Sequence, residues 1–206
     1  MLKIRKIVCA AFMTLLSVSL TLVVTYGVSH AGGGTVTGTV TVPLPKFKKD
    51  CVVYIENVSG NWPPTAGAQI NQKGLVFIPH VLPVVANTSV EFLNHDNVLH
   101  NVFTPDKIAE KFNLGTWPPG EVKTYTFQQL GAATLLCNVH AEMEGYVVVL
   151  QNPFFAVTDE KGSYSIKDVP PGLYNLLVWN KKYKGKPKQI AVNDGQSFQA
   201  DFELKK

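Results

Sequence analysis

The chain has 206 residues, of which 46% are hydrophobic and 17% are charged, and 19 basic residues against 15 acidic ones give a net charge of +4. This composition excludes a highly charged, disordered tail protein. The length is sufficient to bury a hydrophobic core, either as one domain or as two small ones.

The first 31 residues have the layout of a secretory signal. Basic residues precede an uncharged, mostly apolar run over 7–24, and Ser29-His30-Ala31 forms a small-x-small step. This order is typical of a signal peptide, so we predict that residues 1–31 are removed and that the protein is periplasmic or secreted, with no stable membrane insertion after cleavage. The alternative is an uncleaved anchor, because the run approaches the ~20 residues that span a bilayer.

The charge of the chain after residue 31 argues against nucleic-acid binding. Removing the three basic residues of the signal leaves 19 − 3 = 16 basic residues against 15 acidic ones, and Arg5 is the only arginine of the whole chain. Nucleic-acid recognition depends on a basic stripe and on arginine forks. We therefore expect no nucleic-acid partner.

The remaining sequence consists of short apolar or β-branched stretches separated by Gly, Pro, Asn and Asp clusters, which is typical of a β-sandwich or barrel. The predicted strands cover residues 35–42, 51–58, 70–78, 84–93, 121–127, 132–137, 146–150, 164–166, 173–179, 189–192 and 197–204. Residues 105–113 have weak helical character and form at most a short helix inside a long loop. We therefore predict an all-β fold.

Metal-binding residue types converge between two predicted strands, in the run Cys137-Asn138-Val139-His140-Ala141-Glu142-Met143. Each residue spans at most ~3.6 Å, so a thiolate, an imidazole and a thioether at i, i+3 and i+6 can face one point. His100, at the end of another polar loop, supplies a second imidazole. Two His, one Cys and a weak Met define a trigonal blue-copper site with a long axial ligand.

The donor set favours electron transfer over catalysis. Thiolate and thioether are soft donors that suit Cu(I), while imidazole suits both oxidation states. The protein would fill every strong coordination position of the ion and leave no open site for a substrate. We therefore expect one type 1 copper ion and a single-electron carrier that is not an enzyme.

The same segment resembles the cupredoxins of the amicyanin/plastocyanin-like group, which are blue copper proteins with a Greek-key β-sandwich. The residues that carry the resemblance follow the family's order over about residues 70–150: 77–79, 90–96, 99–102, 137–143 and 145–149. The resemblance implies that His100, Cys137, His140 and Met143 bind copper.

It further implies that Asn101 ties the two ligand loops together and donates a backbone hydrogen bond toward the sulfur of Cys137. Such neighbouring groups tune the metal. The electron would leave through His140 to a redox partner such as a c-type cytochrome or an oxidoreductase. The sequence departs from the family at Ala141, where Pro is frequent, and at Glu142 and Glu144, either of which could replace Met143 as axial ligand.

The flanking segments resemble a second family, the carboxypeptidase regulatory-like (transthyretin-like) β-sandwich. The resemblance rests on the opening step 36–40 and on the turns within 158–166 and 169–174. It implies an insertion, with residues 32–60 and 151–206 forming a small sandwich around a cupredoxin at 61–150. The alternative is two domains in series, with residues 32–60 belonging to the cupredoxin.

Two other metal and thiol arrangements are possible. Cys51 and Cys137 could form a disulfide in an oxidising compartment, although the full ligand set around Cys137 favours copper. His80 and His95 could bind a second metal ion, but single histidines at strand ends are more often surface residues. Trp62 and Trp117, each followed by two prolines, could line a partner site, but packing in loops is the more frequent role of such residues.

Other functions also stay open at this point. The basic run 181–188 could dock an acidic partner, although a solvated loop is the more frequent role of such a run. Periplasmic copper binding and delivery is one rival to electron transfer. An extracellular adhesion or carbohydrate-binding sandwich is the second.

Overall fold

A computed structural model describes residues 32–206, and the predicted signal peptide lies outside this range. The described part is almost entirely β-structure, so the predicted all-β class is confirmed. None of its helices is long and apolar enough to cross a membrane.

The strands and the two short 3₁₀ helices follow one another closely along the chain. The strands are β1 (Gly34–Thr41), β2 (Val52–Glu56), β3 (Gln69–Gln72), β4 (Phe77–Ile78), β5 (Val81–Val85), β6 (Thr88–Asn94), β7 (His100–Phe103), β8 (Asn113–Trp117), β9 (Val122–Phe127), β10 (Gly131–Leu136), β11 (Glu144–Leu150), β12 (Phe155–Val157), β13 (Ser163–Val169), β14 (Gly172–Trp179), β15 (Lys188–Val192), β16 (Ser197–Gln199) and β17 (Phe202–Glu203). The 3₁₀ helices are η1 (Pro45–Phe47) and η2 (Lys107–Ala109).

The strands from residues 69–150 form two sheets, which we call the central sandwich. One sheet has the order β5-β11-β10-β7-β8, and the other has the order β4-β3-β6-β9. Apolar side chains from both sheets share one buried cluster that includes Ile70, Phe92, Leu135 and Val147. Alternation along each strand sends these residues inward, because successive side chains of a strand point to opposite faces.

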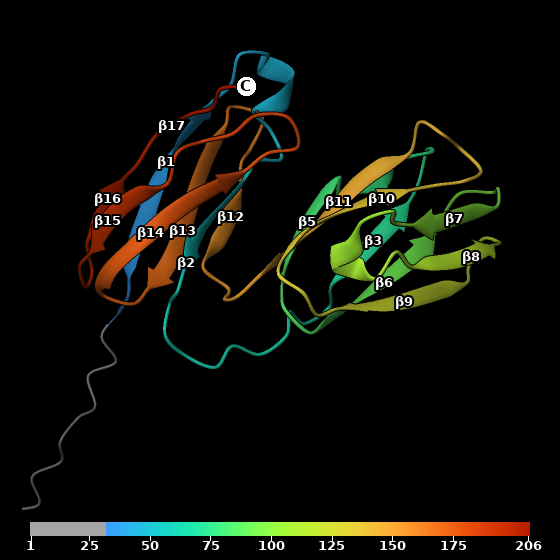
Figure 1. Ribbon diagram of the computed structural model, residues 1–206, viewed down its shortest axis with the longest axis horizontal. Helices are drawn as coiled ribbons and strands as arrows, with labels where there is room; N and C mark the ends of the chain where they lie inside the picture. Colours follow the sequence, from blue (N-terminus) through green and yellow to red (C-terminus); the bar gives the residue numbers. More distant parts are fainter. Residues whose placement is uncertain (1–31) are drawn as a thin grey trace, which may run out of the picture. The chain divides into compact units, whose positions relative to one another are not determined.

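The first two strands pair with the strands that follow residue 151, and together they form the flanking sandwich. In one sheet β1 lies between β13 and β16, with β17 also paired to β1, and the other sheet has the order β12-β2-β14-β15. Figure 1 shows the first strand, in blue, within the same sheet as the last strands, in red. The domain boundaries at residues 60 and 150 stay a prediction.

A third buried cluster contains side chains of both sandwiches. Val52 of β2 packs with Val81 of β5 and with Tyr146, Val148 and Leu150 of β11. Tyr146, Val148 and Leu150 lie on the face of β11 opposite to Val147, because the side chains of a strand alternate. The two sandwiches are therefore joined through apolar packing as well as through the chain.

The structure corrects several predicted boundaries. The single strand expected over 84–93 is divided into β5 and β6 by a turn at Asn87, whose φ of 68° lies in the left-handed region that Asn tolerates. The final strand, 197–204, is likewise divided into β16 and β17. Strands β7, β8 and β12 were not among the predicted strands, and the single strand expected over 70–78 is divided into β3 and β4. The expected helical stretch 105–113 holds only η2, which ends as Glu110 and Lys111 adopt positive φ.

Candidate metal centre

Strand pairing places Cys137 and Met143 at the two ends of a closed loop. Leu136, the last residue of β10, is paired with Glu144, the first residue of β11. The seven residues between them therefore form the connection of a hairpin, and the N–H of Met143 donates to the carbonyl of His140 within it (3.1 Å). Cys137 and Met143 are both buried in the core cluster of the central sandwich.

Strand β7 brings His100 to the same place. Leu136 of β10 is paired with Phe103 of β7, so the start of β7 and the end of β10 lie in neighbouring strands. His100 is the first residue of β7, and its side chain is fully buried. Burial of an imidazole next to a thiol is more typical of a functional site than of simple packing.

Three of the four predicted ligands come together. One ligand atom each of His100, Cys137 and His140 lies within 4.8 Å of the others. The two Nδ1 atoms of His100 and His140 are 3.2 Å apart, and the sulfur of Cys137 is 4.0 Å from Nδ1 of His140. In zinc sites metal–nitrogen bonds are about 2.1 Å long and metal–sulfur bonds about 2.3 Å long. Two such bonds together are longer than the separation of either pair of donor atoms, so one ion can contact both atoms of each pair. The three residues therefore fit one first-row metal ion.

Asp96, which the sequence analysis did not identify, orients His100. Its Oδ2 atom is 2.9 Å from Nε2 of His100, and its two oxygens accept hydrogen bonds from the N–H groups of Gly74 (2.7 Å) and Leu75 (3.0 Å). Burial by itself would raise the pKa of Asp96, but these N–H donors and His100 outweigh it and lower the pKa to about 2.

An ionised Asp96 accepts hydrogen bonds only, so His100 donates through Nε2–H. The lone pair of Nδ1 then faces Cys137 and His140, as in the carboxylate–histidine–metal arrangement of many metal sites. A carboxylate four residues before a candidate ligand histidine was the signal that could have indicated this role.

Buried amides hold the two ligand loops. The side-chain Oδ1 of Asn101 accepts from the N–H of Asn138 (3.2 Å), and its Nδ2 donates to Asn113 (2.8 Å) and Gly115 (2.7 Å). Asn94 similarly donates to the carbonyls of Val98 and Trp117 and braces the loop before His100. Asn101 therefore ties the loops together. The expected bond from its backbone N–H to the sulfur of Cys137 is not among the hydrogen bonds of residues 32–206.

The sulfur of Cys137 is a free thiol, as is that of Cys51, and this contradicts the disulfide alternative. Cys51 is buried in the flanking sandwich, where its sulfur lies 3.2 Å from the side-chain amide of Asn180. Its burial raises the pKa of the Cys51 thiol, since desolvation disfavours the thiolate. Cys51 is therefore a packing residue and Cys137 a candidate ligand.

The two glutamates beside Met143, Glu142 and Glu144, differ in exposure and in hydrogen bonding. Glu142 is exposed, whereas Glu144 accepts hydrogen bonds from Lys181 (2.5 Å) and from the hydroxyl of Tyr146 (2.5 Å). Burial raises the pKa of Glu144, but the bonds from Lys181 and Tyr146 outweigh it and lower the pKa. Both oxygens of Glu144 are thus engaged away from the ligand group.

The other histidines and the two tryptophans lie outside the ligand group. His80 lies against the ring of Tyr146 (centroids 5.6 Å apart), and His95 is exposed. Trp62 packs edge-on against Phe154 (5.0 Å). Trp117, which was expected in a loop, is instead the last residue of β8 and is fully buried. Within residues 32–206, His100, Cys137 and His140 form the group of three that can hold a metal ion, and His80 and His95 are not part of it.

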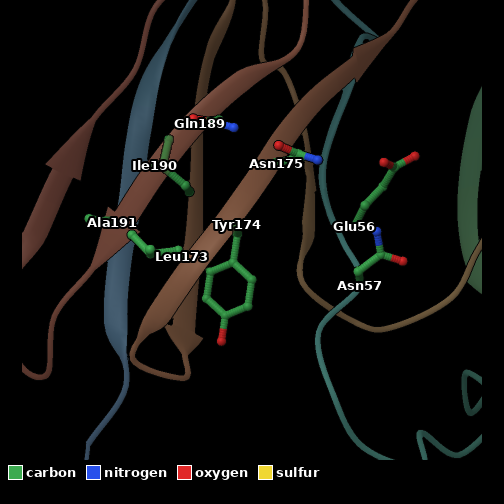
Figure 2. A pocket seen from close by; sticks show the side chains of 8 residues that line it. All are labelled: Glu56, Asn57, Leu173, Tyr174, Asn175, Gln189, Ile190 and Ala191. Atoms are coloured by element: carbon green, nitrogen blue, oxygen red, sulfur yellow. The ribbon is translucent and has the colours of Figure 1, made fainter.

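A hollow of about 460 Å³ lies on the flanking sandwich, away from any histidine or cysteine (Figure 2). Its polar lining comes from Glu56, Asn57, Tyr174, Asn175 and Gln189. Figure 2 shows these side chains at the end of β2 and on β14 and β15. The lining combines amides with one carboxylate and the phenol of Tyr174, and it contains no histidine, cysteine or lysine.

Comparison with known proteins gives likeness over parts of the chain. A family model described as polysaccharide lyase family 4, domain II, matches residues 129–200. No curated protein matches the chain. The resemblance of the flanking segments to the carboxypeptidase regulatory-like sandwich stays a prediction.

Several solved structures are similar to part of the chain. A purple cupredoxin from Nitrosopumilus maritimus is 25% identical with a TM-score of 0.37, and the match covers 40% of this chain and 98% of that one. A reduced Cu(I) form of an amicyanin variant is 19% identical with a TM-score of 0.39, over 47% and 97% of the two chains. A copper-containing nitrite reductase from Thermus scotoductus is 23% identical with a TM-score of 0.39, and the match spans 53% of this chain but 28% of the reductase.

Proposed function

We propose that this protein is an exported copper protein that carries single electrons through one type 1 site at His100, Cys137, His140 and Met143. The observation that carries the proposal is the convergence of one thiol and two Nδ1 atoms within 4.8 Å of one another. This donor set selects copper over harder ions, since thiolate and imidazole suit Cu(I) and Cu(II). Copper bound there supplies a one-electron couple.

The residues around the ligands support a rigid site. Asp96 holds the ring of His100, and Asn101 joins the loop of His100 to the loop of Cys137. A site held in one geometry for both oxidation states needs little rearrangement when an electron moves. Met143, which is fully buried in the same cluster as Cys137, is the proposed fourth and weaker ligand.

His140 is the proposed route of the electron, because it is the one member of the group that is half-buried rather than buried. Its neighbour Val139 is 47% exposed, and Leu99, next to His100, is 52% exposed. Exposed apolar residues beside a ligand suit transient docking of a redox partner, for which we propose a c-type cytochrome or an oxidoreductase. The proposal includes no catalytic step on a substrate.

The visible spectrum of the protein with Cu(II) tests this function. The protein should show an intense thiolate-to-copper band that is lost in Cys137→Ser and kept in Cys51→Ser, because only Cys137 belongs to the ligand group. The copper should also cycle reversibly between its two states by voltammetry. A colourless protein at full copper occupancy would overturn the type 1 site, and a coloured protein that cannot cycle would favour copper delivery.

A further inference from the structure

Most of the lysines lie on three short segments of the flanking sandwich. Residues 45–50, 181–188 and 203–206 contain ten of the 16 lysines that follow residue 31. Their acidic residues are Asp50 and Glu203, so the three segments carry a net charge of 10 − 2 = +8. Along the sequence the first segment is separated from the other two by more than a hundred residues.

Specific contacts join the three segments into one surface, which we call the basic surface. The side-chain amide of Asn180 donates to the carbonyl of Phe47 (2.9 Å), and the ring of Phe47 lies edge-on against that of Tyr183 (5.8 Å). Lys184 and Lys205 exchange both backbone hydrogen bonds (2.8 and 2.9 Å). The lysines are therefore held near one another by the fold.

Like charges are crowded on this surface. The ammonium groups of Lys46, Lys181 and Lys182 lie 5.2, 6.0 and 5.0 Å from the ring centroid of Phe47. Lys184 and Lys205 are directly opposite each other in an antiparallel pair, an arrangement that is destabilising for like charges. The fold therefore retains an unfavourable arrangement that an anion would relieve.

Carboxylates of the protein balance few of these lysines. Ion pairs connect Lys49 to Glu160, Lys181 to Glu144 and Lys205 to Glu203. The other seven of the ten lysines have no carboxylate partner within 4.0 Å in the described part of the chain. The surface thus presents positive charge that attracts an acidic ligand.

The shape and composition of the surface narrow the class of ligand. A groove of about 500 Å³ is lined by five lysines, together with Gly185, Phe202 and Glu203; the lysines are Lys184, Lys186, Lys188, Lys205 and Lys206. Phe202 is only 2% exposed, so it provides no face on which a base or a sugar ring could stack. The described residues include no arginine for paired contacts to phosphate.

A concave groove suits a flexible chain better than a flat bilayer surface. Lysines act as separate point charges on flexible stems, which suits carboxylates spaced along an extended peptide. The hollow shown in Figure 2 is a contrast on the same sandwich, because it is lined by amides and Glu56 and by no lysine. We propose that the basic surface binds an acidic segment of a partner protein, an extended run of Asp and Glu residues lying in the groove beside Lys184, Lys186 and Lys205.

A labelled glutamate peptide tests this proposal without reference to the metal. Its binding to the metal-free protein is measured by fluorescence anisotropy at low and at physiological salt, with anionic lipid vesicles and inorganic polyphosphate as competing ligands. The variant Lys184→Gln/Lys186→Gln/Lys205→Gln is compared with Lys107→Gln/Lys111→Gln/Lys167→Gln, which removes the same charge elsewhere. Circular dichroism verifies that both variants are folded.

The wild type should bind the peptide, and binding should weaken as salt increases, because exposed charges are screened. The first variant should lose about tenfold in affinity, as expected for three exposed ion pairs, and the second less than twofold. Equal losses in both variants, no binding at low salt, or binding of vesicles or polyphosphate but not of the peptide would each overturn the proposal.

Discussion

The two sandwiches of this protein differ in charge and in what they bury. Residues 61–150 have four lysines against seven acidic residues, a net of 4 − 7 = −3, whereas residues 32–60 and 151–206 together have 12 − 8 = +4. All four histidines that follow residue 31 are in the central sandwich. The weak net charge of the whole chain conceals this separation into an acidic half with metal-binding chemistry and a basic half without it.

The buried polar residues differ in the same way. The central sandwich buries Gln72, Asn94, His100 and Asn101, among others, and Gln72 Oε1 and Trp117 Nε1 have no hydrogen-bond partner in the described part of the chain. Unpaired buried polar atoms are costly to stability. The flanking sandwich buries Asn152 and Thr158, and both form hydrogen bonds. The central sandwich therefore buries more polar side chains than the flanking sandwich, and it includes buried polar atoms without a partner among the described residues.

The largest effect should come from a cavity in the flanking sandwich. Leu176 is fully buried in its core, and Leu176→Ala should lower the free energy of unfolding by about 2–5 kcal/mol, through lost burial and the cavity left behind. Urea unfolding measures this loss. The folded Leu176→Ala protein should keep the copper spectrum of the wild type. An altered spectrum would show that the flanking sandwich influences the metal site.

The second effect concerns the orientation of His100. Asp96→Asn preserves the size of the side chain but removes the charge that fixes Nε2–H, and we expect metal affinity to fall about 10–100-fold. Competition with a chelator measures this affinity. Asp201→Asn, an exposed aspartate of the flanking sandwich, is the matched control and should leave it unchanged. Equal affinities for the two variants would remove Asp96 from the site.

A smaller effect should come from the ion pair between the sandwiches. Lys181 binds Glu144, while its neighbour Lys182 has no carboxylate partner among the described residues. Lys181→Met should lower the free energy of unfolding by about 0.2–1 kcal/mol more than Lys182→Met, the range for exposed ion pairs. Amide exchange near Glu144 should also become faster in the metal-free protein. Identical behaviour of the two variants would show that the pair contributes nothing.

The smallest effect is a pH dependence of the flanking sandwich. The N–H and then the hydroxyl of Thr39 donate to Asp201 and lower the pKa of its carboxyl. The stability that this provides is present above the unfolded pKa of about 3.9 and is lost as the pH falls through the lower folded pKa. Urea unfolding of the metal-free protein below about pH 4 should show a shallower decline for Asp201→Asn than for the wild type. Parallel declines would contradict this role.

Local sequence patterns were sufficient to predict many of the strands. The β-branched run at β1 and the mostly apolar run at β14 are strand signals, and both strands were predicted. Strand β8 was missed because its sequence, NLGTW, contains Gly115 and has little alternation. It forms by pairing with β7 along 100–103, which is a tertiary effect. Strand β12, three residues long, is likewise defined by its pairing with β2.

The sequence by itself determined the all-β class and the residue types of the candidate site, because strand periodicity and the spacing of Cys137, His140 and Met143 are local properties of the chain. Only the tertiary structure decided that Asp96 orients His100, that Cys51 and Cys137 are free, and that lysines from three distant segments form one surface. The physical reason is that strand pairing joins residues far apart along the chain, and a linear pattern carries no record of those partners.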